Sequence, residues 1–375
     1  MLMMRPIKRL TGFSWHARLR WLGAIATLGA LAAVAVPGGA TAGAAGASNV
    51  YDQANLVSDI PGVARITDPN LVNPWGMSGG PTTPLWIADN GANVATLYSG
   101  GVGGTIPAIV PLVVSIPDGA PTGTVFNATS DFVIHQGDTT APARFIFVSE
   151  NGKLTAWTPT TPLTTEAQVE FSSDDAVYKG LAIASTAHGT FLYAANFHEA
   201  RIDVFNSHFA PVKLSGRFTD ESIPAGFAPF DIQQLGGSLY VTYAMQNAAR
   251  HDDVAGPGNG FVDVYDTSGH LLRRLISHGD LNSPWGLALA PAGFGAFSND
   301  LLVGNFGDGA IHAYDPNTGA LAGQLTNADG NPIVIDGLWG LRFGNGVTGT
   351  PTTLLFTAGI AKEAHGLFGE ITAHS

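Results

Sequence analysis

Short apolar segments recur along the chain at a regular spacing, and turn residues separate them. Six of these segments begin at a glycine or aspartate next to apolar residues, and these anchor residues stand at positions 76, 131, 180, 231, 286 and 340. Successive anchors are therefore 49 to 55 residues apart. A fixed period of this length is typical of a repeat fold, in which every repeat is one unit of secondary structure.

Each anchor is followed by a continuous apolar or aromatic run, such as Leu85–Ala88 and Phe145–Val148. A third run alternates polar and apolar residues, as in Arg201–Phe205, and this alternation predicts a strand with one packed face and one wetter face. A fourth apolar stretch follows in five of the repeats. The pattern therefore predicts four strands per repeat and no sustained helix. Tandem β-sandwiches do not fit, because their units are about twice as long.

The sixth repeat has no fourth strand before the chain ends at Ser375. The early segment Tyr51–Val57 has the character to pair beside Gly366–Ile371 and to complete that repeat. Propellers join their two ends in this way, which leaves no exposed sheet edge. We therefore expect residues 43–375 to form an all-β, six-bladed β-propeller with four-stranded blades, closed by an N-terminal strand that completes the last blade.

Residues 1–42 have a different pattern. Five basic residues precede the uncharged run 21–36, and the small residues Ala40-Thr41-Ala42 follow it. This order is typical of a signal peptide, and the apolar run is short for a membrane span. The interpretation predicts cleavage near Ala42 or Ala45 and a protein that is secreted to the periplasm or the medium. A membrane anchor is the alternative interpretation.

Composition narrows the class of partner. The chain has no cysteine, so its stability cannot depend on disulfides. Without residues 1–42, twelve basic residues remain against 29 acidic ones. A surface with this acidic excess repels nucleic acid and anionic membranes. We expect a monomer that binds a small molecule, a glycan or a protein, with no membrane span after cleavage.

Several motifs resemble those of known six-bladed propellers. Pro74-Trp75-Gly76 and Pro284-Trp285-Gly286 at strand starts, and Ala88-Asp89-Asn90 and Gly304-Asn305 at strand ends, resemble NHL-type and gluconolactonase-like propellers. The stretch from Asn55 to Gly76 looks more narrowly like a bacterial family of exported conserved hypothetical proteins, some of which carry PEP-CTERM sorting tails. The resemblance runs from about Asn55 to the C-terminus, and it implies the propeller fold without implying a reaction.

Gluconolactonase-like propellers place a set of Glu, Asn and Asp oxygens around a divalent cation such as calcium. By position in the repeat, the residues that match this set are Glu150, Asn196, Asp231 and Asn305. Hard cations take carboxylate and amide oxygens, so the residue types suit calcium. The alternative is structural, because Asp and Asn after a strand commonly bond their own turn.

In a propeller, the loop that enters the first strand and the loop that joins the second and third strands lie on one face, where ligands usually bind. These two loops carry most of the candidate ligand-binding residues and also Lys179 and Glu363. The candidates are Trp75, Asn90, Asn151, His198, Arg250, His251, Trp285, Trp339 and His365. The histidines suit a transition metal or acid–base chemistry. The tryptophans suit stacking on a flat ligand or packing between blades. Residues 244–259 form the longest insertion, which makes this loop a candidate site of added function.

Two functions remain open from the sequence. The first is a non-catalytic binding scaffold that holds a ligand or partner at the channel face. The second is a metal-dependent, calcium-type hydrolase similar to a lactonase, with its site at the channel mouth. The sequence favours the first, because the acidic residues are spread across the blades with no clear nucleophile or base.

Overall fold

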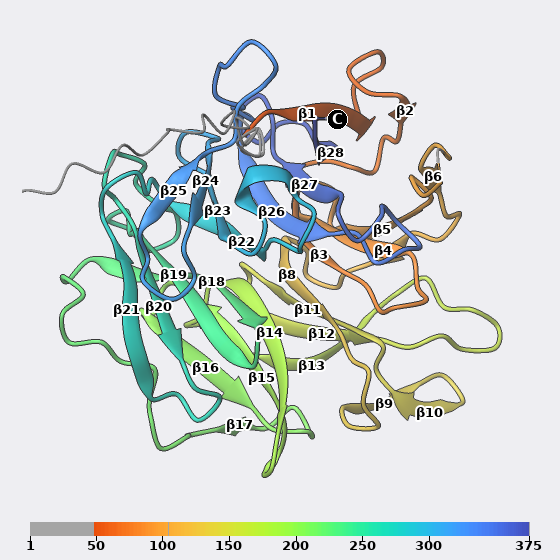
Figure 1. Ribbon diagram of the computed structural model, residues 1–375. Helices are drawn as coiled ribbons and strands as arrows, with labels where there is room; N and C mark the ends of the chain where they lie inside the picture. The colour runs from red at the N-terminus through yellow and green to blue at the C-terminus, as the bar shows by residue number, and fades with distance from the viewer. Residues whose placement is uncertain (1–48, 104, 375) are drawn as a thin grey trace, which may run out of the picture. The chain divides into compact units, whose positions relative to one another are not determined.

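Six sheets of four or five strands follow one another around a ring in the computed structural model, which describes residues 49–103 and 105–374 (Figure 1). Each of these six sheets is one blade. The predicted all-β, six-bladed propeller is therefore confirmed. Residues 1–42, predicted as a signal peptide, lie outside the described residues. Among the described residues, no helix is long and apolar enough to cross a membrane.

The first three blades take up the part of the chain from residue 74 to residue 212. Blade 1 contains β3 (Pro74–Ser78), β4 (Leu85–Asp89), β5 (Val94–Ser99), β6 (Ala108–Ile109) and β7 (Val114–Ser115), the last two both paired with β5. Blade 2 contains β8 (Pro121–Phe126), β11 (Phe145–Ser149), β12 (Lys153–Trp157) and β13 (Gln168–Ser172). Blade 3 contains β14 (Tyr178–Thr186), β15 (Gly189–Asn196), β16 (Arg201–Phe205) and β17 (Pro211–Val212).

The last three blades complete the ring, and the helical content of the described residues is two short 3-10 turns, Asn90–Ala92 and Gly295–Phe297. Blade 4 contains β18 (Phe227–Leu235), β19 (Ser238–Met245), β20 (Phe261–Tyr265) and β21 (Leu271–Ser277). Blade 5 contains β22 (Pro284–Leu289), β23 (Leu301–Asn305), β24 (Ile311–Tyr314) and β25 (Leu321–Gln324). Blade 6 contains β26 (Leu338–Phe343), β27 (Leu354–Ala358), β28 (Leu367–Ala373), β1 (Tyr51–Ser58) and β2 (Ile66–Thr67).

The two ends of the described chain meet in blade 6. Strand β1 pairs antiparallel with β28 from Tyr51 opposite Ala373 to Ser58 opposite Leu367. Figure 1 shows the two strands side by side, one at the red end and one at the blue end of the colour scale. The N-terminal strand thus completes the last blade, as predicted.

Close contact between inner strands explains the glycine at their starts. A Cβ atom added to Gly76 would lie 2.5 Å from the carbonyl oxygen of Thr122 in the next blade. The same atom added to Gly123 would lie 2.5 Å from the amide nitrogen of Leu181. Both distances are shorter than van der Waals contact, so only glycine allows the backbones to approach this closely. Neighbouring blades therefore contact each other directly through the backbones of their inner strands, which form the inner ring.

The inner strand of blade 2 is not the one that the sequence pattern predicted. The segment around Asp131 was expected to be an inner strand, but the inner strand is β8 and its ring residue is Gly123. The side chain of Asn127 instead organises a turn, because it accepts from the N–H of Thr129 at 2.9 Å and donates to the carbonyl of Asp131 at 2.9 Å. A hairpin of β9 (Val133–Gln136) and β10 (Thr139–Pro142) then follows. The residues Asp131-Phe132-Val133 lead into this inserted hairpin, and in the sequence they resemble the start of a repeat.

This correction makes a testable prediction about stability. We expect Gly123→Ala to lower the free energy of unfolding by at least about 2 kcal/mol, because the new Cβ would meet backbone atoms that cannot rotate away. We expect Asp131→Ala to change it by less than about 0.5 kcal/mol. Urea denaturation of both variants measures the difference. A larger loss for Asp131→Ala than for Gly123→Ala would contradict the assignment of β8 as the inner strand.

Candidate functional site

The inner strands of all blades begin on one face of the ring, and the second strands end there. Pro74 at the start of β3 pairs with Asp89 at the end of β4, and Tyr178 pairs with Asn196 in the same way. We call this face the entry face. It carries most of the residues that the sequence indicated as candidates.

Beneath the entry face, an aromatic cluster fills the centre of the ring. We call it the aromatic plug, and its large side chains are Trp75, Phe197, Phe230, Trp285, Phe306 and Trp339. Trp339 is stacked on both sides, with ring centroids 3.5 Å from Trp75 and 3.9 Å from Phe306. Trp75, Trp285 and Trp339 are at most 3% exposed. The three predicted tryptophans therefore pack against one another and do not offer an open face to a flat ligand.

A buried ion pair lies directly on the plug. The Lys179 ammonium donates to Glu150 Oε1, and the Asn90 amide donates to Glu150 Oε2 at 2.9 Å. The Lys179 Nζ atom lies 4.9 Å from the centroid of the Trp75 ring, within range of a cation–π interaction. The Lys179 side chain is 2% exposed and that of Glu150 is 13% exposed. Residues of blades 1 and 3 thus both bond to the Glu150 carboxylate of blade 2.

Glu363 approaches the same place from blade 6. Its Oε1 accepts from the Asn73 amide at 3.1 Å, and Asn73 Oδ1 accepts from the Trp339 indole at 3.2 Å. Burial raises the pKa of Glu363, and the negative charges of Glu150 and Asp253 raise it further, whereas Asn73 and Lys179 lower it. The Glu363 carboxylate is therefore within electrostatic range of the ion pair.

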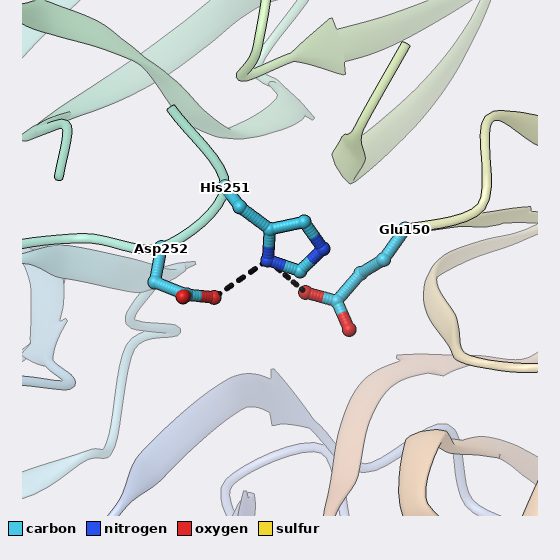
Figure 2. A group of neighbouring side chains, drawn as sticks. All are labelled: Glu150, His251 and Asp252. Carbon is cyan, nitrogen blue, oxygen red and sulfur yellow. Dashed lines mark hydrogen bonds and ion pairs between the residues drawn. The ribbon is translucent and has the colours of Figure 1, made fainter. Parts of the chain in front are cut away.

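The insertion 244–259 brings a histidine and two aspartates to the group. His251 Nδ1 lies 2.7 Å from Asp252 Oδ1 and 4.0 Å from Glu150 Oε1 (Figure 2). Burial tends to raise the pKa of Asp252, but the hydrogen bond with His251 and the charge of Lys179 lower it overall. Burial raises the pKa of Asp253, and Asp253 Oδ2 has no hydrogen-bond partner.

These residues form a single charged cluster on the entry face. Its members are Glu150, Lys179, His251, Asp252, Asp253 and Glu363. They come from blades 2, 3, 4 and 6, so the cluster exists only once the ring has closed. Four carboxylates surround one ammonium, which leaves an excess of negative charge.

The predicted calcium ligands have separate hydrogen-bond partners. The Asn196 amide donates to Asp203 of the same blade at 2.8 Å, and the Asn305 amide donates at 2.8 Å to the carbonyl of Asp280, in the loop between blades 4 and 5. Asp231 lies within the inner strand of blade 4, where burial raises its pKa to about 7. Of the four residues, only Glu150 belongs to the charged cluster, and a calcium ion shared by all four stays a prediction.

The structure offers a different set of possible metal ligands. One ligand atom from each of Glu150, His251 and Asp252 lies within 4.8 Å of the others (Figure 2). A nitrogen and two carboxylate oxygens suit zinc better than calcium. However, Glu150 Oε1 already accepts from the Lys179 ammonium, so a metal ion on that oxygen would have to displace the ammonium.

Four predicted residues are not members of the charged cluster. His365 Nδ1 lies 2.7 Å from Asp59 Oδ2, between the loop before β28 and the residue that follows β1. The Asn151 amide donates to the carbonyl of Asp118. Arg250 is exposed, and the backbone carbonyl of His198 accepts from Gln246 at 3.4 Å. These contacts give His365 and Asn151 structural partners.

Sequence reasoning placed Lys179 and Glu363 at the entry face but gave neither a role. Lys179 stands next to the ring glycine of blade 3, at the start of a buried strand. A lysine is almost never fully buried without a partner, so this position was the signal that a carboxylate had to lie close to it. Which carboxylate it was depended on how the blades are arranged around the ring.

Comparison with known proteins identifies relatives but no activity. No protein-family model matches the chain. Among solved structures, the virginiamycin B lyase of Staphylococcus aureus aligns with a TM-score of 0.46 at 13% identity, over 86% of this chain and 98% of that one. A protein provisionally assigned as a gluconolactonase aligns with a TM-score of 0.41 at 17% identity, over 68% and 88% of the two chains. At these values the likeness concerns the fold alone.

Two viral proteins are much closer in sequence. The uncharacterized protein R648 of Acanthamoeba polyphaga mimivirus is 33% identical in an alignment of 331 positions that covers 84% of this chain and 78% of R648. The uncharacterized protein L690 of the same virus is 32% identical in an alignment of 295 positions that covers 76% of this chain and 77% of L690. The chain therefore belongs to the same family as the mimivirus proteins R648 and L690.

Proposed function

We propose that this protein is a non-catalytic binding protein that holds a small, positively charged ligand on the entry face. The observation that supports this is the unbalanced charge of the cluster. Four carboxylates surround the single ammonium of Lys179, Asp253 Oδ2 has no partner, and neighbouring carboxylates contribute to the raised pKa of Glu363. A ligand with an ammonium or guanidinium group would relieve this repulsion and supply the missing hydrogen bonds.

Lys179 indicates which chemical group this face stabilises. Its ammonium lies between a carboxylate and an indole ring, which is a common environment for a bound cation. The same ion pair argues against covalent chemistry through Lys179. The Nζ atom is held by the Glu150 carboxylate inside the protein, with the Lys179 side chain 2% exposed, so it is not free to attack a substrate.

A metal-dependent hydrolase is the second candidate. The observation that favours it is the convergence of Glu150, His251 and Asp252 within 4.8 Å. Bound there, a metal ion would supply Lewis-acid chemistry at the channel mouth. The Lys179 ammonium on Glu150 Oε1 favours the binding function over this one, because the ammonium and the metal ion would compete for one oxygen.

Export is part of the proposal. A basic start, the apolar run 21–36 and the small residues Ala40-Thr41-Ala42 support cleavage of a signal peptide and release to the periplasm or the medium. The resemblance to exported bacterial proteins agrees with this and stays a prediction. The acidic excess supports a small-molecule, glycan or protein partner rather than nucleic acid, and we propose that the protein acts as a monomer.

Titration calorimetry on protein freed of metal by a chelator tests the two candidates against each other. The probes are putrescine, zinc ion and calcium ion. The binding function predicts that putrescine binds, and that the double variant Asp253→Asn/Glu363→Gln weakens it at least about tenfold by removing charged acceptors. The matched control is Glu166→Gln, which removes an exposed carboxylate that precedes β13 outside the cluster.

The possible outcomes separate the candidates. Putrescine binding that the double variant loses and the control keeps would support the binding function. Stoichiometric zinc binding that raises the melting temperature and is lost in His251→Gln would support the hydrolase instead. If neither putrescine nor a metal ion binds the intact protein, both functions are wrong for this face.

A further inference from the structure

A cavity of about 250 Å³ lies in the central channel, on the other side of the aromatic plug from the charged cluster. Its wall is made by the inner strands β18, β22 and β26 together with Met77 of β3. The wall begins at Trp285, which belongs to the plug, and continues to Leu235, Leu289 and Phe343 at the far ends of those strands. Leu289, at the far end of β22, lines the cavity and is 40% exposed, so the cavity opens toward the face opposite the entry face.

Three residues that line the cavity each have one buried polar atom without a hydrogen-bond partner. These atoms are Asp231 Oδ1, Trp285 Nε1 and Arg342 Nε. Asp231 and Trp285 are 1% and 2% exposed. Leaving a buried donor or acceptor without a partner costs about 1–3 kcal/mol each. Three such atoms on the wall of one cavity indicate a site built to bind polar groups.

The two charged groups on this wall are not paired with each other. Arg342 donates from Nη2 to the carbonyl of Gly79 at 2.8 Å, and it forms no ion pair with Asp231 or with another carboxylate of the described chain. Burial lowers the pKa of Arg342. A buried cation and a buried carboxyl group therefore face one cavity, and each lacks an opposite charge.

Asp231 occupies a position in the inner ring at which every other blade has a glycine. The other inner strands have a glycine at the equivalent position, and these residues are Gly76, Gly123, Gly180, Gly286 and Gly340. The ring therefore does not need a side chain there in order to close. An aspartate in the one strand that contributes most of the polar side chains of the cavity points to a role other than packing.

We infer that the channel cavity is a second binding site, and that its ligand is a small zwitterion of the amino-acid type. The carboxylate of such a ligand would pair with Arg342, and its ammonium would pair with Asp231. The indole N–H of Trp285 is a further donor for the carboxylate. The volume of about 250 Å³ exceeds the roughly 30 Å³ that one water molecule takes up, so it admits a small organic molecule. This site does not depend on the function proposed for the entry face.

Titration calorimetry with a series of linear amino acids tests the inference. Glycine, β-alanine and 4-aminobutyrate separate the two charges by increasing distances, and acetate and methylamine carry one charge each. We expect one member of the series to bind at least about tenfold more tightly than either single-charge probe, because it forms two charge-assisted hydrogen-bond pairs instead of one. Quenching of indole fluorescence that is reduced in Trp285→Phe would place the bound probe in the cavity.

Two variants with a matched control complete the experiment. Arg342→Gln and Asp231→Gly should each weaken the best zwitterion at least about tenfold, and Asp231→Gly restores the residue that the other blades already use at this position. Arg273→Gln is the control, since Arg273 also donates to a backbone carbonyl and has a buried, unpaired Nε, but it lies in the outer strand β21. Melting curves establish that each variant is folded.

The result that would overturn the inference is equally specific. If no zwitterion binds more tightly than acetate and methylamine, or if Arg273→Gln weakens binding as much as Arg342→Gln, then the cavity holds only water. Zwitterion binding that is lost in Asp253→Asn/Glu363→Gln but kept in Arg342→Gln and Asp231→Gly would also overturn it, because the probe would then be bound at the entry face.

Discussion

A protein that begins after Ser58 is expected to melt at least about 10 °C below one that begins at Asn49. The missing strand is β1, which buries Tyr51, Leu56 and Val57 almost completely. Burying each of these side chains contributes roughly 1.5–3 kcal/mol, and the total approaches the whole stability of many proteins. The loss would also expose β28 as an open sheet edge.

The first residue of β1 also ties the closing strand to blade 5. The Tyr51 hydroxyl donates to the carbonyl of Phe294 at 3.0 Å, and the ring stacks on Phe297 at 5.9 Å between centroids. Differential scanning calorimetry of the two truncated proteins measures the effect, and the one that starts at Asn49 is the matched control because it keeps every strand. Equal melting temperatures would show that β1 does not close the ring.

Lys179→Met is expected to lower the free energy of unfolding by about 3 kcal/mol. The substitution keeps much of the side-chain volume but leaves Glu150 as a largely buried carboxylate without its ammonium. The double variant Lys179→Met/Glu150→Gln should recover at least half of the loss, because it removes the uncompensated charge as well. Urea unfolding of both single variants and the double variant gives the coupling energy.

The outcome separates a specific ion pair from general packing. If Lys179 contributes only by packing on Trp75, the two effects will add and the double variant will be less stable than either single variant. Asn90→Ala is a useful comparison because it removes the other hydrogen bond to Glu150, at 2.9 Å, without removing a charge. We expect a loss of only about 1 kcal/mol from that change.

Most of the architecture could be predicted because it is repeated. Glycine next to an apolar strand start recurs in every blade except blade 4, because neighbouring inner strands touch there, and blade 4 has Asp231 at the same position. Blade 2 was the exception, because the hairpin β9–β10 supplied a second apolar start near Asp131. Closure by Tyr51–Val57 could be predicted because a four-stranded repeat with one strand missing needs a partner elsewhere in the chain.

The candidate site was less predictable. Position within a repeat indicated correctly that Glu150, His251 and Lys179 lie at the entry face. It could not indicate that the Asn196 and Asn305 amides would bond to Asp203 and to the carbonyl of Asp280, or that Asp231 would lie on the wall of the channel cavity. Side-chain direction at a strand end depends on local hydrogen bonds, which the repeat pattern does not contain.

The sequence by itself therefore determined the number of blades, their four-stranded make-up and the way the ring closes, because each of these follows from local strand patterns and from a period. The tertiary structure alone decided which charges meet. Glu363 and Asn73 are 290 residues apart in the chain, and Lys179 and Glu150 belong to different blades. Such contacts arise only when closure of the ring brings the blade ends to a common centre, and no local pattern encodes them.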